Sequence, residues 1–311
     1  MPTSYRRAEP PRYWLAAALF AATFFFTTTL GALATPMADA FQSPATREAL
    51  WASPAMIVAV WGNGDLLRLG LSFSVPLLII LFCHEMGHYL ACRHYRLPAT
   101  LPYFLPLPVG LGTLGAFIKI KGAIRRKAEL FDVGVAGPLA GFAVLIPFLL
   151  YGIAHSSLQP VEPIPAGMQG ISLGINGALW LAIQGIHGPL PEGMAVSLHP
   201  TALAAWLGLL ATALNLLPVG QLDGGHILYA AIGRRQWHLA VPLWAALAVA
   251  GWFSHVWWVW CTFLLVMGLR HPPVLDEAQP LDRRRRWLAV LALVVLLLSF
   301  TPLPLVVVEG P

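Results

Sequence analysis

The chain has 311 residues, of which 58% are hydrophobic and only 11% are charged. In a typical soluble domain about a quarter of the residues are charged. This composition therefore excludes an ordinary soluble protein and indicates a polytopic membrane protein. The formal net charge of +5 does not indicate a nucleic-acid partner, because the cations cluster in loops between apolar segments, where they are a topology signal. We therefore expect a lipid bilayer around the chain and no bound nucleic acid.

Hydropathy predicts an all-α polytopic membrane protein with about six to seven transmembrane helices. A helix needs about 20 apolar residues to cross a hydrocarbon core of about 30 Å. In chain order, the expected spans are residues 14–34, 71–93, 131–153, 200–217, 238–253, 256–269 and 287–308. The fifth and sixth are short for a span and are expected to form a shallow hairpin.

Two stretches between these spans depart from the helical pattern. Residues 112–120 alternate and are rich in glycine and β-branched residues, which predicts a small re-entrant β element between the second and third spans. Residues 155–199 contain no Lys or Arg, and their prolines and glycines mark a loop. Within this loop, the apolar residues 171–186 are expected to form an interfacial or re-entrant element.

The Lys and Arg residues predict the orientation of the chain. With the N-terminus in the cytoplasm, seventeen of the nineteen cations fall in cytoplasmic segments, and only Arg47 and Arg68 fall outside. An excess of positive charge is typical of cytoplasmic loops. The sequence therefore predicts a multi-pass protein with a cytoplasmic N-terminus, and we expect the membrane to be a bacterial inner (plasma) membrane.

The most informative motif is His84-Glu85-Met86-Gly87-His88, inside the second expected span. A helix places residues i and i+4 on one face, so His84 and His88 are positioned to bind one metal ion with Glu85 beside it. Ionisable groups at membrane depth are costly and are retained mainly where they form a site. The motif predicts a zinc centre at which Glu85 takes a proton from zinc-bound water. The competing interpretation is a buried polar cluster without catalysis.

A catalytic zinc site usually has three protein ligands and one open position, so a third ligand is needed. The fourth expected span runs into the sequence NLLPVGQLDGGH, residues 215–226, whose proline and glycines break the helix. Asp223 follows the break at the same expected depth as His88. It is interpreted either as the third ligand or as the N-cap of the next helix. His226 is a rival ligand or a neighbour of the ligand set.

Several other conspicuous residues are interpreted as structural. Asp132 is expected to be the N-cap of the third span. Gly137, Pro138 and Gly141 are expected to be helix-packing positions. The tryptophans at 257, 258 and 260 fit an aromatic belt at the outer membrane face.

HEMGH in a membrane span followed by NLLPVGQLDGGH resembles the site-2 protease family of intramembrane zinc metalloproteases. The resemblance covers roughly residues 75–235. Many members carry a PDZ domain, which this chain lacks, and the stretches GTLGAFIKI (residues 112–120) and FDVGVAGP (residues 131–138) resemble the PDZ-less subgroup of bacteria and plastids.

This resemblance implies the roles of individual residues. It makes His84, His88 and Asp223 the ligands of one Zn²⁺ per chain and Glu85 the general base. It also implies that Asn215 holds the substrate backbone near the metal. From the residues alone, a buried Asn215 that hydrogen-bonds a neighbouring helix is a serious competitor.

We interpret residues 1–311 as a single integral-membrane metalloprotease domain, with a catalytic core at about 71–235 and flanking spans at 14–34 and 238–308. The expected activity is hydrolysis of peptide bonds within or near transmembrane segments of membrane or membrane-anchored proteins, at a site towards the cytoplasmic face. The alternative is a non-proteolytic membrane zinc protein, either a transporter or an inactive relative that binds client proteins. A transporter needs ligands distributed across the membrane, and an inactive relative is expected to lose Glu85.

The charge distribution makes a direct prediction about topology. A reporter domain fused after Arg126 should lie in the cytoplasm, because that loop belongs to the positively charged side. A reporter fused after Gln159 should lie outside. Compartment-specific activity of the two fusions measures this, and the reverse pattern would contradict the predicted orientation.

Overall fold

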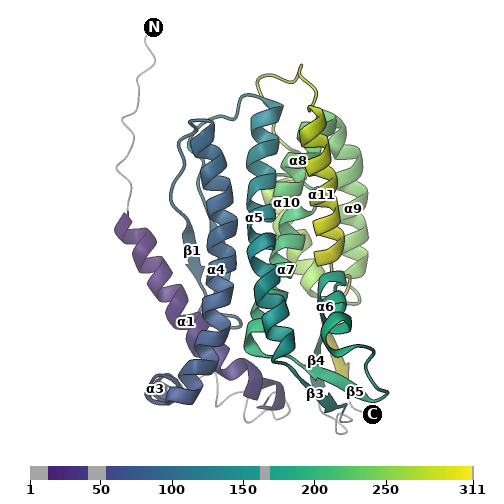
Figure 1. Ribbon diagram of the computed structural model, residues 1–311. Helices are drawn as coiled ribbons and strands as arrows, with labels where there is room; N and C mark the ends of the chain where they lie inside the picture. Colours follow the sequence, from purple (N-terminus) through teal and green to yellow (C-terminus); the bar gives the residue numbers. More distant parts are fainter. Residues whose placement is uncertain (1–12, 41–53, 162–168, 310–311) are drawn as a thin grey trace.

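A computed structural model describes residues 13–40, 54–161 and 169–309 (Figure 1). Its centre is α4 (Gly64–His94), which packs against α1 (Tyr13–Ala40), α5 (Lys127–Ala154) and α7 (Pro200–Leu216). α5 also packs against α7 and α8 (Asp223–Ile232), so the middle of the chain forms one continuous helical bundle. The remaining helical elements are α3 (Pro54–Gly62), α6 (Gly177–His187), η1 (Gly233–Gln236), α9 (Trp237–Ala250), α10 (Val256–Met267) and α11 (Arg283–Ser299).

The chain is mostly helical, as predicted, and each expected span coincides at least in part with a helix. Within the described residues, three helical segments are long and apolar enough to cross a membrane, namely Tyr13–Ala32, Gly64–His94 and Lys127–Ala154. α7 and α10 are apolar but shorter. The protein is therefore an integral membrane protein, and the total number of spans stays a prediction.

Three helix ends that carry basic residues lie together at one end of the bundle. The C-terminal end of α4 and the N-terminal ends of α5 and α11 lie together at the top of Figure 1. These ends carry Arg93 and His94, Lys127, and Arg283 to Arg286, respectively. We call this the basic end.

A partly buried polar contact at the basic end corrects one sequence expectation. Asp132 does not cap α5, because the helix already begins at Lys127, where Glu129 forms a capping box. Asp132 instead accepts hydrogen bonds from Nε and Nη2 of Arg285, at 2.9 and 2.6 Å, and another from the Tyr95 hydroxyl. This contact ties α4, α5 and α11 together.

The β element between α4 and α5 is an antiparallel hairpin of β1 (Tyr103–Pro106) and β2 (Thr113–Phe117). Tyr103 pairs with Phe117, and the register shifts between Phe104 and Pro106. α1 packs along β1, and β2 lies against α4. Strand pairing in this region was expected, and its depth in the membrane stays a prediction.

Two further strand pairs lie at the other end of the bundle, near the C-terminus in Figure 1. β3 (Ser157–Pro160) pairs with β5 (Met194–Ser197), and β4 (Gln169–Leu173) pairs with β6 (Leu305–Glu309). The expectation that the last span continues to residue 308 was wrong. α11 ends at Ser299, and Pro302 and Pro304 follow it, so the final apolar residues are released to pair as a strand.

The interior of the bundle is closely packed around α7. Trp206 is 1% exposed, and its indole N–H donates to the Gly174 carbonyl at 2.8 Å. Trp257, expected in an aromatic belt, is also only 1% exposed and donates to the Pro302 carbonyl at 2.7 Å. That expectation was wrong for Trp257 because the segment after α11 folds over it.

The contact at the basic end can be tested by a double-mutant cycle. Asp132→Ala should lower the free energy of unfolding by about 1–2 kcal/mol, since it removes charge-assisted hydrogen bonds that are about three-quarters shielded from solvent. In the Asp132→Ala background, Arg285→Ala should lower the free energy of unfolding only slightly further. Thermal unfolding in detergent measures both changes, with the exposed Arg284→Ala as the control. Fully additive losses would show that the two side chains do not interact.

Candidate metal centre

The helix α4 buries all three ionisable residues of its motif. His84 is 6% exposed, and Glu85 and His88 are each 7% exposed. The i, i+4 spacing turns both imidazoles to one face, where their Nε2 atoms lie 3.1 Å apart. The predicted histidine pair is therefore formed by the helix itself.

Asp223 reaches these histidines because the chain reverses sharply between α7 and α8. Gly220 has φ +56°, a conformation that favours glycine. A Cβ on Gly224 would lie 1.9 Å from the Leu216 carbonyl oxygen, and one on Gly225 would lie 2.4 Å from the Gly220 carbonyl oxygen. Only glycine permits this close return of the backbone.

The carboxylate completes a three-residue group. Asp223 Oδ2 lies 3.3 Å from Nε2 of His84 and 3.3 Å from Nε2 of His88. The N-cap of α8 is Leu222, and Asp223 is the first residue of the helix. The structure thus does not make Asp223 the N-cap; its carboxylate lies against the imidazoles.

The spacing of these three atoms fits a tetrahedral zinc ion. With zinc bonds of about 2.0–2.1 Å, two ligand atoms of a tetrahedral site lie about 3.3–3.4 Å apart. The three observed separations, 3.1 to 3.3 Å, are close to the edges of such a tetrahedron. The donor set of two imidazoles and one carboxylate is typical of catalytic zinc sites. Among the residues that the structure describes, His84, His88 and Asp223 form the one group of three or more His, Cys, Asp or Glu side chains whose ligand atoms lie close enough together to hold a metal ion.

A backbone carbonyl fixes the orientation of one of these histidines. Nδ1 of His88 lies 2.7 Å from the carbonyl oxygen of Val133 on α5. Because a carbonyl only accepts, Nδ1 carries the proton and Nε2 presents its lone pair to the metal position. The sequence offered no signal for this partner, since any residue type supplies a carbonyl.

Glycines on α5 make room for the ligand helix. A Cβ on Gly137 would lie 2.1 Å from Nε2 of His88, and one on Gly141 would lie 3.1 Å from Cβ of His84. The expectation that these are packing positions is confirmed. The sequence did not show that they pack against the two histidines.

Glu85 and Asn215 lie beside the three-residue group. The backbone of Ile118, just after β2, lies against the Glu85 carboxyl group. Nδ2 of Asn215 lies 3.4 Å from Nε2 of His84. The hairpin, the histidine helix and the end of α7 therefore meet at one place.

His226 is turned away from this group. Its Nδ1 lies 2.7 Å from Nε2 of His271, so the ring pairs with a histidine of the loop after α10. Tyr229, which stacks on His271, donates to Glu277 at 2.5 Å, and this hydrogen bond lowers the pKa of the Glu277 carboxyl group. His226 thus belongs to the contact between α8 and this loop, and its role as a rival ligand is not supported.

Comparison with known proteins points to one family. The model of Peptidase family M50 matches residues 72–250. The chain is 30% identical over 251 residues to the probable zinc metalloprotease EGY2, chloroplastic, of Arabidopsis thaliana, covering 80% of this chain and 44% of that protein. It is 32% identical over 238 residues to EGY2 of Oryza sativa subsp. indica, covering 72% of this chain and 41% of that protein. The chain therefore spans less than half the length of these relatives.

The glycine contact yields a prediction about metal affinity. Gly137→Ala should weaken zinc binding by about 10- to 100-fold, because the new methyl group overlaps the His88 ring and displaces a ligand. Titration of the metal-free protein with zinc measures this change. The control is Gly185→Ala on α6, where an added Cβ meets no atom within 4 Å. Equal affinities of the two variants would mean that the ring moves aside without cost to the site.

Proposed function

Because the chain belongs to peptidase family M50, the site-2 protease family, we propose that it is an intramembrane zinc endopeptidase that hydrolyses peptide bonds within or near the transmembrane segments of other membrane proteins. The observation that carries this proposal is the meeting of the Asp223 carboxylate with the His84 and His88 imidazoles. We interpret these three residues as the zinc ligands and residues 1–311 as one membrane metalloprotease domain.

Glu85 is the proposed general base. Zinc, when bound, lowers the pKa of a water molecule towards neutrality and polarises a peptide carbonyl. The Glu85 carboxylate accepts the proton of that water and later donates it to the nitrogen of the leaving amine. Its burial beside the histidines supports this role, because a carboxyl group in an apolar helix needs a function or a partner to be retained.

Asn215 is the proposed contact to the substrate backbone. Its amide nitrogen lies 3.4 Å from Nε2 of His84, a proposed ligand on α4, so it is close enough to reach a peptide bound at the proposed metal position. An amide N–H there donates to the developing oxyanion or to a substrate carbonyl.

The β1–β2 hairpin is the proposed docking edge for substrate. Helical amides are shielded by their own hydrogen bonds, so a transmembrane substrate must unwind before it is cut. β2 leads directly to Ile118, whose backbone lies against Glu85. An unwound peptide that adds to β2 as a further strand is delivered to the general base, in the manner of β-augmentation.

We propose that the basic end faces the cytoplasm and that cleavage occurs near that face. His88 lies six residues before the end of α4 at His94, which is about 9 Å along a helix. The opposite end, with its three paired strands from the long loop, then lies outside.

The transporter alternative receives no support from the described residues. A transport path needs ligands at several depths, whereas the metal-binding group of His84, His88 and Asp223 lies at a single depth. An inactive client-binding relative is also disfavoured, because Glu85 is present and buried at the site.

Two substitutions separate metal binding from catalysis. Glu85→Gln should retain zinc and lose cleavage by at least 100-fold, since it removes only the base. Asp223→Asn should lose most of its bound zinc and most of its cleavage activity, since it removes a proposed ligand. Purified variants would be incubated with a panel of single-span substrates while their zinc content is measured.

The matched control is Glu192→Gln, an exposed residue of the long loop that should leave both properties unchanged. Equal cleavage by the wild type and Glu85→Gln would remove Glu85 from the mechanism. Full zinc content in Asp223→Asn would remove Asp223 from the ligand set.

A further inference from the structure

A surface groove lies between α1, α4 and the hairpin, away from the three-residue group of His84, His88 and Asp223. It consists of two adjoining cavities of about 520 and 580 Å³. Ala16 on α1 and Leu101 before β1 line both cavities, so the two are continuous. We call this the α1 groove.

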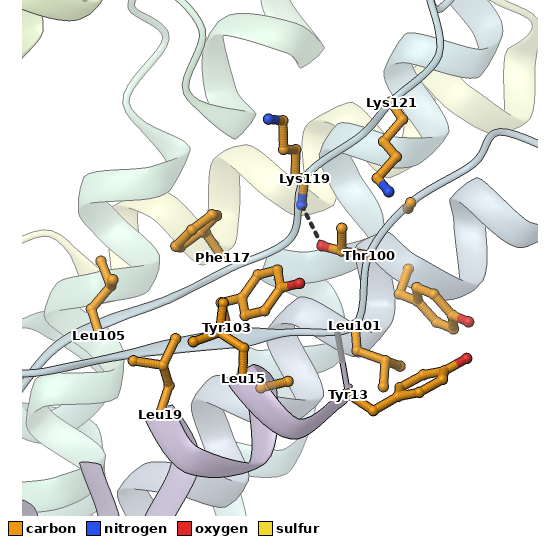
Figure 2. A pocket seen from close by; sticks show the side chains of 13 residues that line it. Tyr13, Leu15, Leu19, Thr100, Leu101, Tyr103, Leu105, Phe117, Lys119 and Lys121 are labelled. Carbon is orange, nitrogen blue, oxygen red and sulfur yellow. Dashed lines mark hydrogen bonds between the residues drawn. The ribbon is translucent and has the colours of Figure 1, made fainter. Parts of the chain in front are cut away.

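One half of the groove carries two positive charges among apolar and tyrosine side chains. Lys119 and Lys121 lie at one end of this half, and Leu15, Leu19 and Leu105 lie towards the other (Figure 2). Lys119 is held in place by its backbone, whose N–H donates to Oγ1 of Thr100 at 2.9 Å. Both lysines are exposed.

No negative charge neutralises these lysines within the part of the chain that the structure describes. No carboxylate lines this half of the groove, and neither ammonium group forms an ion pair with a carboxylate. Tyr13, Tyr89 and Tyr103 also line it. Tyrosine, with an apolar ring and a polar hydroxyl, is typical of the membrane interface.

The other half of the groove is wholly apolar. Its lining includes Phe20 and Phe24 of α1 and runs along α4 from Met86 to Val75. That distance is about 16 Å at 1.5 Å per residue, close to half of a hydrocarbon core of about 30 Å. The apolar half of the groove is therefore about as long as one leaflet is deep. One acyl chain of a phospholipid covers that length.

We infer that the α1 groove binds an anionic phospholipid, whose headgroup phosphate lies at Lys119 and Lys121 and whose acyl chain lies along α4. The two halves match the two chemical parts of a phospholipid in the correct order, with the charged part at the basic end. Anionic lipid is attracted to such clusters of cations at the membrane surface.

The charge of the groove favours an anionic lipid over a transmembrane helix. The phosphate of such a lipid supplies the negative charge that the groove lacks at its two lysines, whereas an apolar substrate helix supplies none.

Lipid retention tests this inference without any measurement of proteolysis. The full-length protein in detergent would be given equal amounts of phosphatidylglycerol and phosphatidylcholine, and bound lipids would be counted by native mass spectrometry. We expect phosphatidylglycerol to be preferred at least fivefold. The double variant Lys119→Gln, Lys121→Gln should abolish that preference, and Ala16→Trp should reduce binding of both lipids by filling the junction of the cavities.

Matched variants distinguish the groove from the general surface. Arg283→Gln with Arg284→Gln removes the same charge from exposed positions at the basic end, and Ala17→Trp adds the same bulk at an exposed neighbour outside both cavities. Both should behave like the wild type, and thermal unfolding checks that every variant is folded. Equal binding of the two lipids by the wild type, equal effects of the lysine and arginine pairs, or a retained transmembrane peptide in place of lipid would each overturn the inference.

Discussion

The contact of the Asp223 carboxylate with the His84 and His88 imidazoles requires particular positions of the surrounding helices. The two motifs lie more than a hundred residues apart in the chain, so they meet only if α7 and α8 reverse direction at the depth of the histidines. Gly224 and Gly225 allow that reversal, and Gly137 of α5 leaves room for the His88 ring. The Val133 carbonyl from the same helix then sets the tautomer of His88. α5 is thus a wall of the proposed metal centre, although none of its side chains belongs to the three-residue group.

Hydrogen bonds between polar groups also connect α4 to its neighbouring helices, where lipid would offer these groups no partner. Thr28 of α1 hydrogen-bonds Ser74 of α4 at 2.8 Å, and Thr201 of α7 donates to the Ser72 carbonyl at 2.7 Å. A Cβ on Gly70 would lie 2.2 Å from the Thr28 carbonyl oxygen, so α1 and α4 approach closely at the same place. These contacts hold α4 from two sides. A fixed α4 keeps the histidine pair in one position relative to Asp223.

Local patterns were predictable from the sequence, whereas long-range contacts were not. The histidine pair follows from helix geometry, and the apolar segments follow from composition. Hydropathy cannot distinguish an apolar helix from an apolar strand, so it extended the last span through residues that pair as β6 with β4. Asp132 was misassigned because a carboxylate near a helix start resembles a cap, while its partner Arg285 is distant in the chain. The groups that surround the ligands, such as Val133 O and the Ile118 backbone, are main-chain atoms with no signature in the residue types.

The position of the proposed metal centre accounts for the irregular backbone beside it. Non-helical backbone at membrane depth is tolerated only where protein or a water-filled cavity satisfies its polar groups. Hydrolysis consumes water, so the proposed centre needs a path to the aqueous phase, and a site about 9 Å from the end of α4 makes that path short. An unwound substrate exposes its own amides and needs the same polar surroundings. The break before α8 and the β1–β2 hairpin therefore lie where, under the proposed function, water, substrate backbone and the three proposed ligands would have to meet.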